Sequence, residues 1–171
     1  MGEREILFRG KDLQEQNGWL YGYFYKSDIN KRERESGKAT LVFTPNCDTF
    51  IYVPEYHNSW MVKPETVGQY TGLTDRDGTR IFEGDIVKVL NAFNVEVVFK
   101  KGAFGVYSSY VDYDYLDSEI AEITGCNNPS RFCRCDNFVS LWELMWNYNQ
   151  EDDCCSVVEI IGNIHDNGYP F

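Results

Sequence analysis

The sequence predicts a protein that is predominantly β, with a smaller helical part. Short runs of Tyr, Phe, Val, Ile and Thr recur along most of its 171 residues, and glycine-containing corners separate them. Such runs are typical of strands joined by tight turns. One later stretch instead spaces its apolar residues three and four apart, which is the helical period. We therefore expect an α+β fold in which antiparallel strands dominate.

The N-terminal part, residues 1–65, is expected to form an antiparallel β lobe. Strands are predicted at residues 4–9, 19–26, 39–43 and 49–53, because each run is apolar and aromatic and turn-rich residues separate them. The following stretch, "PEYHNSWMVKP", lies between two prolines and is expected to be a loop with one edge segment.

Residues 66–171 are expected to form a second lobe, a small barrel or sandwich of short strands. Hairpins are predicted to turn at Asp77-Gly78, as a type I′-like turn, and at Lys101-Gly102, with strands at 86–90 and 156–164. A helical, Cys-containing insert is expected at about 112–155. Its helices are predicted at 113–123 and 136–149, the second capped by Asp136 or Asn137.

Charge is concentrated at the C-terminal end of the chain. Residues 112–171 carry 2 basic and 12 acidic groups, whereas residues 1–45 carry 8 basic and 7 acidic groups. The acidic third should repel phosphate backbones, which disfavours nucleic-acid binding there. The chain has no apolar run of 18 residues and no hydrophobic leader at its start, so we expect a cytoplasmic protein that does not engage membranes.

Four carboxylates cluster in "QYTGLTDRDGTRIFEGDIVKV", residues 69–89, and could suggest a metal loop or an acid–base pair. A calcium loop counted from Asp75 would need Gly at Arg80 and Glu at Ile86, and both requirements fail. Glu83 and Asp85 would need a cleft to perform acid–base chemistry. We expect Asp85 to accept backbone N–H groups at a corner instead.

The cysteines raise the alternative of a zinc site. Five of them could provide zinc ligands across the predicted insert, with Asp136 or His165 completing the set: Cys126, Cys133, Cys135, Cys154 and Cys155. Their spacing lacks the two C-x2-C knuckles that zinc prefers. Neither His57 nor His165 forms a motif with a cysteine, so we expect no catalytic residue, no cofactor and reduced thiols.

Tyrosines gather in two short stretches of the chain, at Tyr21–Tyr25 and Tyr107–Tyr115. Rings of this kind can stack on single-stranded bases. Because Lys and Arg do not alternate with them in sequence, we expect core and sheet-face residues rather than a nucleic-acid platform.

Four segments carry a resemblance to a known family. In chain order they are "REILFRGKDLQEQNGWLYGYFY", "KPETVGQYTGLTDRDGTRIFEGDIVKV", "GAFGVY" and "VEIIGNIHDN". Together they resemble the YopX protein family of bacteriophages and prophages. The resemblance implies a β-rich fold with an SH3-like barrel toward the C-terminus. The family has no established activity or catalytic residues, so the resemblance transfers no site to this chain. Residues 112–155 and the ending "NGYPF" depart from the family pattern.

The sequence thus favours an uncharacterised phage or prophage protein, a non-enzymatic module that acts through protein–protein contacts in the bacterial cytoplasm. Self-association is compatible with its many Tyr and Trp residues. The alternative is a nucleic-acid-binding or DNA-mimicking regulatory protein of phage replication or host takeover, for which the near-neutral N-terminal lobe or the acidic last third would supply the surface.

Overall fold

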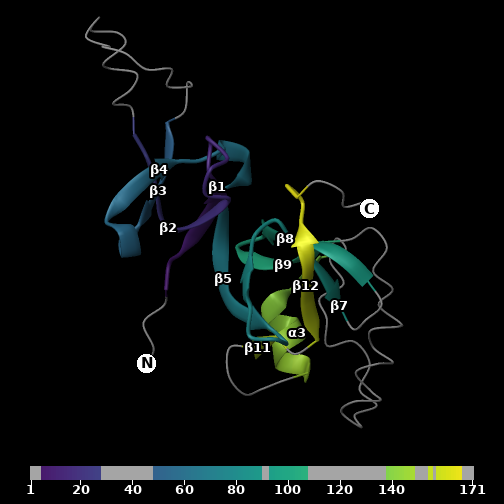
Figure 1. Ribbon diagram of the computed structural model, residues 1–171. Helices are drawn as coiled ribbons and strands as arrows, with labels where there is room; N and C mark the ends of the chain where they lie inside the picture. Colours follow the sequence, from purple (N-terminus) through teal and green to yellow (C-terminus); the bar gives the residue numbers. More distant parts are fainter. Residues whose placement is uncertain are drawn as a thin grey trace, which may run out of the picture. The chain divides into compact units, whose positions relative to one another are not determined.

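A computed structural model describes residues 5–27, 48–89, 93–107, 138–148, 154–155 and 157–166 (Figure 1). The chain divides into unit 1, Met1–Tyr70, and unit 2, Thr71–Phe171. Both units are built mainly from antiparallel strands, which confirms the β-rich fold class. The predicted strand at 39–43 and the predicted helix at 113–123 lie outside the described residues.

Unit 1 is an antiparallel sheet with the order β5-β1-β2-β3-β4. The strands are β1 (Phe8–Lys11), β2 (Trp19–Lys26), β3 (Thr49–Val53), β4 (Asn58–Met61) and the first residues of β5 (Gly68–Asp75). The 3-10 turns η1 (Pro54–Tyr56) and η2 (Pro64–Thr66) flank β4. Strands 19–26 and 49–53 are confirmed, and β4 is the expected edge segment. The strand predicted at 4–9 begins later, at Phe8.

One face of the unit 1 sheet is buried. Its core consists of Leu20, Ile51, Val53 and Val62, against which Phe8, Trp60 and Val67 pack. Burial alternates along β3, where Thr49, Ile51 and Val53 are buried and the residues between them are partly exposed. This period of two leaves the opposite face of the sheet outside the core.

The loop between β1 and β2 is held by Asp12, which is only 3% exposed. Its carboxylate accepts the backbone N–H groups of Gln14, Gln16 and Asn17 at 3.0–3.3 Å, and the Asn17 side-chain amide at 2.7 Å. Burying a carboxylate without partners would be unfavourable, and these donors offset that penalty. The loop therefore holds β1 and β2 in a fixed register.

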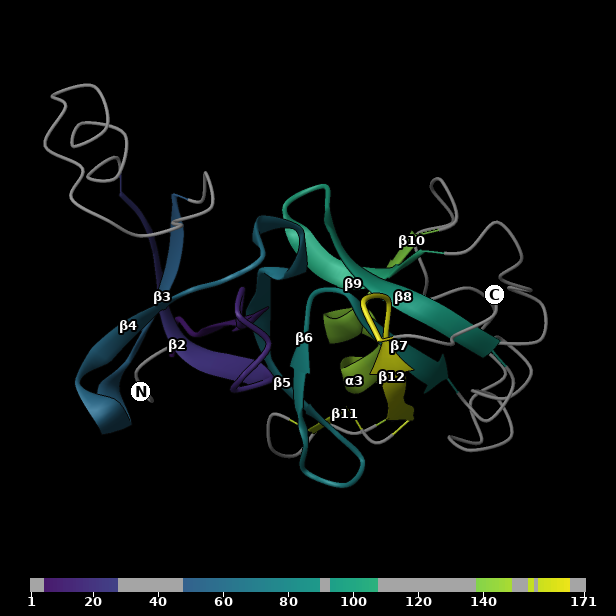
Figure 2. The ribbon, with the colours of Figure 1, turned by 45° about the horizontal axis from the view of Figure 1, so that its top comes forward.

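Unit 2 contains a five-stranded antiparallel sheet with the order β10-β9-β8-β7-β12. Its strands are β7 (Asp85–Val89), β8 (Phe93–Lys100), β9 (Ala103–Tyr107), β10 (Phe138–Ser140) and β12 (Val158–Asn163). Figure 2 shows β8 and β9 as a long hairpin. The rest of β5 pairs with β6 (Arg80–Phe82) and, in parallel, with β11 (Cys154–Cys155).

The helix predicted at 136–149 begins later than expected. Residues Phe138–Ser140 form β10, which pairs with β9, and the helix α3 spans Leu141–Tyr148. Phe138 and Val139 favour a strand, since aromatic and β-branched side chains suit a pleated surface. The cap is Ser140: its Oγ accepts the Glu143 N–H at 3.1 Å, and Glu143 Oε2 accepts the Ser140 N–H at 3.1 Å. This reciprocal capping box replaces the predicted cap at Asp136 or Asn137.

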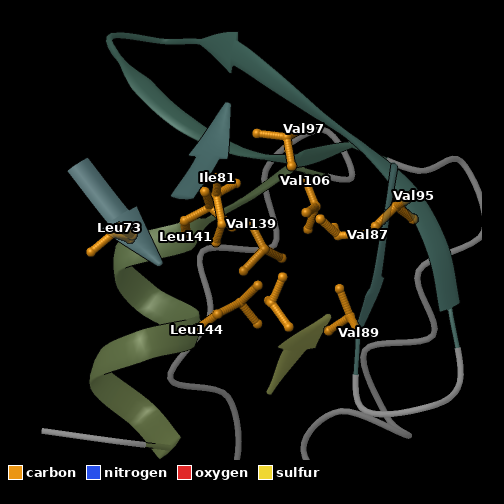
Figure 3. Packing of buried hydrophobic residues seen from close by; sticks show 11 residues of the cluster. Leu73, Ile81, Val87, Val89, Val95, Val97, Val106, Val139, Leu141 and Leu144 are labelled. Carbon is orange, nitrogen blue, oxygen red and sulfur yellow. The ribbon is translucent and has the colours of Figure 1, made fainter. Parts of the chain in front are cut away.

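The unit 2 core joins α3 to both sets of strands (Figure 3). Leu141 and Leu144 point from the helix toward Ile81, Val87 and their neighbours, and all four are at most 1% exposed. Among the described residues, the cluster has eleven members: Leu73, Ile81, Val87, Val89, Val95, Val97, Val106, Val139, Leu141, Leu144 and Val158.

Candidate functional site: an aromatic sheet face

Asp75, the first carboxylate of the 69–89 stretch, is a structural acceptor and only 2% exposed. Its Oδ1 accepts the N–H groups of Asp77 and Thr79 at 3.0 and 2.8 Å, and its Oδ2 accepts the N–H of Ile160 at 3.1 Å. The carboxylate thereby ties the hairpin loop to β12, 85 residues later in the chain.

The hairpin turn that follows is not of type I′. A type I′ turn requires positive φ at both central residues, but Gly78 (φ 79°) has positive φ and Asp77 does not. Gly78 N–H donates to Asp75 O at 3.0 Å, and Asp75 N–H donates to Thr79 O at 2.8 Å. This is the pattern of a type I turn followed by a glycine bulge, so the predicted turn type was wrong. The turn at Lys101-Gly102 has positive φ at both residues and is of type I′.

The corner at Gly84 joins the two most specific sequence motifs in space. Asp85, 1% exposed, accepts the Phe82 N–H at 2.8 Å, which confirms its predicted role. Asn163, at the end of β12, donates its side-chain amide to Gly84 O at 2.6 Å and lies 3.4 Å from Asp85 Oδ1. Gly84 O also accepts the Ile164 N–H at 3.0 Å. "EGD" and "GNIHD" thus form one hydrogen-bonded closure.

Glu83 does not form an acid–base pair with Asp85, because the Asp85 carboxylate is turned into the corner. Glu83 instead interacts electrostatically with the half-buried Glu96 on β8. Burial raises the pKa of the Glu96 carboxyl above its usual value, and the negative charge of Glu83 raises this pKa further.

The candidate metal ligands are only partly in view. Cys126, Cys133, Cys135 and Asp136 lie outside the described residues, and Cys154 and Cys155 form β11 beside β5. The described residues contain no group of three or more His, Cys, Asp or Glu that could hold a metal ion. His57 lies 3.5 Å from the Tyr52 hydroxyl in unit 1, and the His165 N–H donates to Asn163 Oδ1 in unit 2.

The most unusual surface among the described residues lies on unit 1. The odd-numbered residues of β2 are Trp19, Tyr21, Tyr23 and Tyr25, and they share one face because strand side chains alternate. Phe50 and Tyr52 of β3 lie opposite Tyr25 and Tyr23 on that same face. We call these six residues the aromatic face. Tyr21, Tyr23 and Tyr25 are 46%, 55% and 40% exposed, although the even-numbered Leu20 is in the core.

Residues of the neighbouring strands β1 and β3 contact the rings at the two ends of the β2 row. Tyr25 and Phe50 are stacked, with centroids 5.3 Å apart and planes at 15°. At the other end, β1 supplies two cations. Arg9 Cζ lies 4.7 Å and Lys11 Nζ 5.2 Å from the centroid of the Trp19 ring, within cation–π range.

The expectation of core and sheet-face residues at Tyr21–Tyr25 is confirmed. Phe24 packs on the other side, 5.3 Å from Phe8, and the three tyrosines lie on the exposed face of the sheet. No Lys or Arg alternates with the tyrosines of β2, but β1 places two cations beside them through strand pairing, with Arg9 opposite Tyr21 and Lys11 opposite Trp19. The available signal was aromatic residues on both alternating faces of β2, since only one face can be core.

A protein-family model described as YopX protein matches residues 7–128, a segment that contains the whole aromatic face. No curated protein matches the chain. Within the described residues, no helix is long and apolar enough to cross a membrane.

Proposed function

Because the chain belongs to the YopX protein family, we propose that it is a non-enzymatic binding module and that the aromatic face is its binding surface. The observation that carries this proposal is the row of three tyrosines, each at least 40% exposed, on one strand of a well-packed sheet. Tyrosine offers a large, rigid contact area with a polar tip, which suits it to interfaces.

The described carboxylates support a binding role over catalysis. Asp12, Asp75 and Asp85 are buried, and each accepts backbone N–H groups in a turn. A carboxylate held in this way is an anchor, not a proton-transfer group poised toward substrate.

The setting of the proposal follows from the family resemblance. The module would act for a phage or prophage in the cytoplasm of the bacterial host or lysogen. The sequence favours a protein partner, and a second copy of the chain and a nucleic acid are the alternatives. Each of these partners would bind at the aromatic face. The DNA-mimic alternative depends on carboxylates that lie mostly outside the described residues.

We also propose that unit 2 is an SH3-like barrel carrying a helical insert. The antiparallel order β10-β9-β8-β7-β12, with α3 contributing to one continuous core, supports this architecture. The Gly84–Asn163 closure stabilises this unit.

A paired capture experiment tests the binding surface. Full-length protein and the Tyr21→Ser/Tyr23→Ser variant are immobilised and exposed to host lysate, and both protein and nucleic acid are measured in the eluates. We expect the variant to lose the ligand that wild type retains, while Tyr56→Ser, which changes a 68% exposed tyrosine on η1, retains it. Identical capture by wild type and the double variant would contradict the proposal.

A further inference from the structure

We propose that the aromatic face binds single-stranded nucleic acid, with bases stacked on Tyr21, Tyr23 and Tyr25 and the backbone held by Lys11 at one end. This inference rests on the proposed function, because it names the partner of the same face. Its basis is the spacing of the rings, their exposure and the position of the cations.

The spacing of the rings matches an extended nucleic-acid strand. Residues two apart on a β-strand are separated by roughly 6.8 Å. This is about twice the 3.4 Å rise of stacked bases along one strand of DNA. A strand extended along β2 would therefore present one base to each of Tyr21, Tyr23 and Tyr25 in turn, whereas a duplex would keep its bases stacked on one another.

The rings are prepared for stacking. Every base has a π face, so aromatic platforms bind single strands with little dependence on sequence. Phe50 lies nearly parallel to Tyr25, with an angle of 15° between the ring planes, which limits the motion of the Tyr25 ring before any ligand arrives. Tyr25 remains 40% exposed in that arrangement, and Tyr23 is 55% exposed beside it. Rings held in place lose less conformational entropy when a base binds.

The two units differ in net charge: unit 1 is nearly neutral, whereas unit 2 is acidic and should repel phosphate groups. Residues 1–70 carry 9 basic and 10 acidic groups, whereas residues 71–171 carry 7 basic and 17 acidic groups. Arg9 and Lys11 lie against Trp19, at one end of the row of rings. Arg9 is only 7% exposed, so it supports the Trp19 ring, and we assign a phosphate to the partly exposed Lys11 alone. A single phosphate contact beside the rings indicates a binding energy dominated by stacking.

A protein partner fits these observations less well. Protein interfaces also use tyrosine and arginine, but they need no constant ring spacing along a single strand. Three of the five exposed large apolar residues described in unit 1 are the tyrosines of the aromatic face, whereas Tyr56 lies on η1 and Ile6 precedes β1. A row of exposed rings on one strand, with a cation at one end, is the arrangement that single-strand binding sheets use.

Fluorescence anisotropy with labelled 12-mers of oligothymidylate and oligouridylate tests the proposal, with a 12-base-pair duplex as comparison. Wild type is expected to bind both single strands more tightly than the duplex, and a preference between the two identifies DNA or RNA as the ligand. Tyr23→Ala should weaken binding about 5- to 100-fold. Tyr23→Phe should retain it because the ring remains, and Tyr56→Ala should leave it unchanged.

The salt dependence provides a second readout. With Lys11 as the one cation engaged, log K should fall with log salt with a slope of about −0.7, and Lys11→Met should bring that slope close to zero. A slope that Lys11→Met leaves unchanged would overturn the assignment of the backbone to this end.

The remaining outcomes separate this inference from the proposed function. Absence of oligonucleotide binding at low salt, equal binding by Tyr23→Ala, or equal affinity for the duplex would each overturn it, provided that circular dichroism shows the variants folded. If oligonucleotides fail while Tyr21→Ser/Tyr23→Ser still loses a captured protein, the proposed function stands and the nucleic-acid inference falls. If that variant also captures everything that wild type does, both fall.

Discussion

Asp75 shows how a carboxylate that suggests chemistry can be wholly structural. Replacing it with Ala would leave the N–H groups of Asp77, Thr79 and Ile160 without their acceptor. Because a buried donor left unsatisfied costs about 1–3 kcal/mol, we expect Asp75→Ala to lower the free energy of unfolding by about 2–4 kcal/mol. Urea denaturation measures this loss.

Asp77 is the matched control for that measurement. It lies two residues away and is exposed, with one marginal contact to Arg76 at 4.0 Å. Asp77→Ala should change the free energy of unfolding by less than about 0.5 kcal/mol. Equal losses in the two variants would show that Asp75 does not hold the loop.

Asn163 is expected to matter for the same reason on the other side of unit 2. Its buried amide bonds Gly84 O at 2.6 Å, and its Oδ1 accepts the His165 N–H at 2.9 Å. Asn163→Ala should lower the free energy of unfolding by about 2 kcal/mol. Asn58→Ala, at an exposed residue of β4, is the comparison and should cost less than about 0.5 kcal/mol in the same thermal or urea unfolding.

Glu96 should give stability a specific pH dependence. Its folded pKa is raised, so the native state favours the protonated carboxyl. The benefit of that proton is fully present below the unfolded pKa of about 4.5 and is lost as pH rises through the higher folded pKa. Glu96→Gln should therefore stabilise the protein by a few tenths of a kcal/mol at pH 7 and have no such effect at pH 4. Equal effects at both pH values in thermal unfolding would exclude this explanation.

At the scale of the element, two kinds of glycine should respond differently to substitution. A Cβ on Gly22 of β2 would lie 2.0 Å from the Tyr52 carbonyl oxygen, whereas a Cβ on Gly78 would meet nothing within 4 Å. Gly78→Ala should cost roughly 1–2 kcal/mol, through positive φ alone. Gly22→Ala should cost about 3 kcal/mol or more, because β2 and β3 must separate. The reverse order in denaturant unfolding would contradict the β2–β3 register.

The strands of unit 1 and the helix α3 differ in how well the sequence predicts their bounds. The bounds of β2 and β3 follow directly from their apolar and aromatic runs between turn residues. The start of α3 was placed too early because Phe138 and Val139 fit either period, and only pairing with β9 makes them a strand. Asp85 was identifiable as a corner acceptor from its neighbours alone.

The aromatic face could not be predicted in the same way. Its cations come from β1 and its opposing rings from β3, so it exists only once three strands are in register. The sequence of β2 shows alternation but not which alternate set faces solvent, since Tyr and Phe suit both environments. Pairing residues such as Lys11 and Trp19 across strands is tertiary information.

At the scale of the whole molecule, the metal content is the sharpest remaining test of the cysteine prediction. The Cys-x6-Cys-x-Cys spacing of residues 126–135 is not a zinc knuckle, and the described residues gather no metal ligands. We expect purified protein to contain well under one zinc per chain and to keep its unfolding midpoint after treatment with EDTA. Stoichiometric zinc by inductively coupled plasma mass spectrometry would contradict this expectation.

The Gly84–Asn163 closure bears on how this protein should be shortened for experiments. The family match ends at residue 128, but β12 begins at Val158 and pairs with β7 along its length. A chain cut at residue 128 would lose β10, α3 and β12. Strands β7 and β9 would then be open edges of the sheet, and core residues such as Ile81 and Val87 would lose their cover from α3. Open edges and bare apolar surface promote aggregation, so soluble expression requires the chain to extend through Asn163.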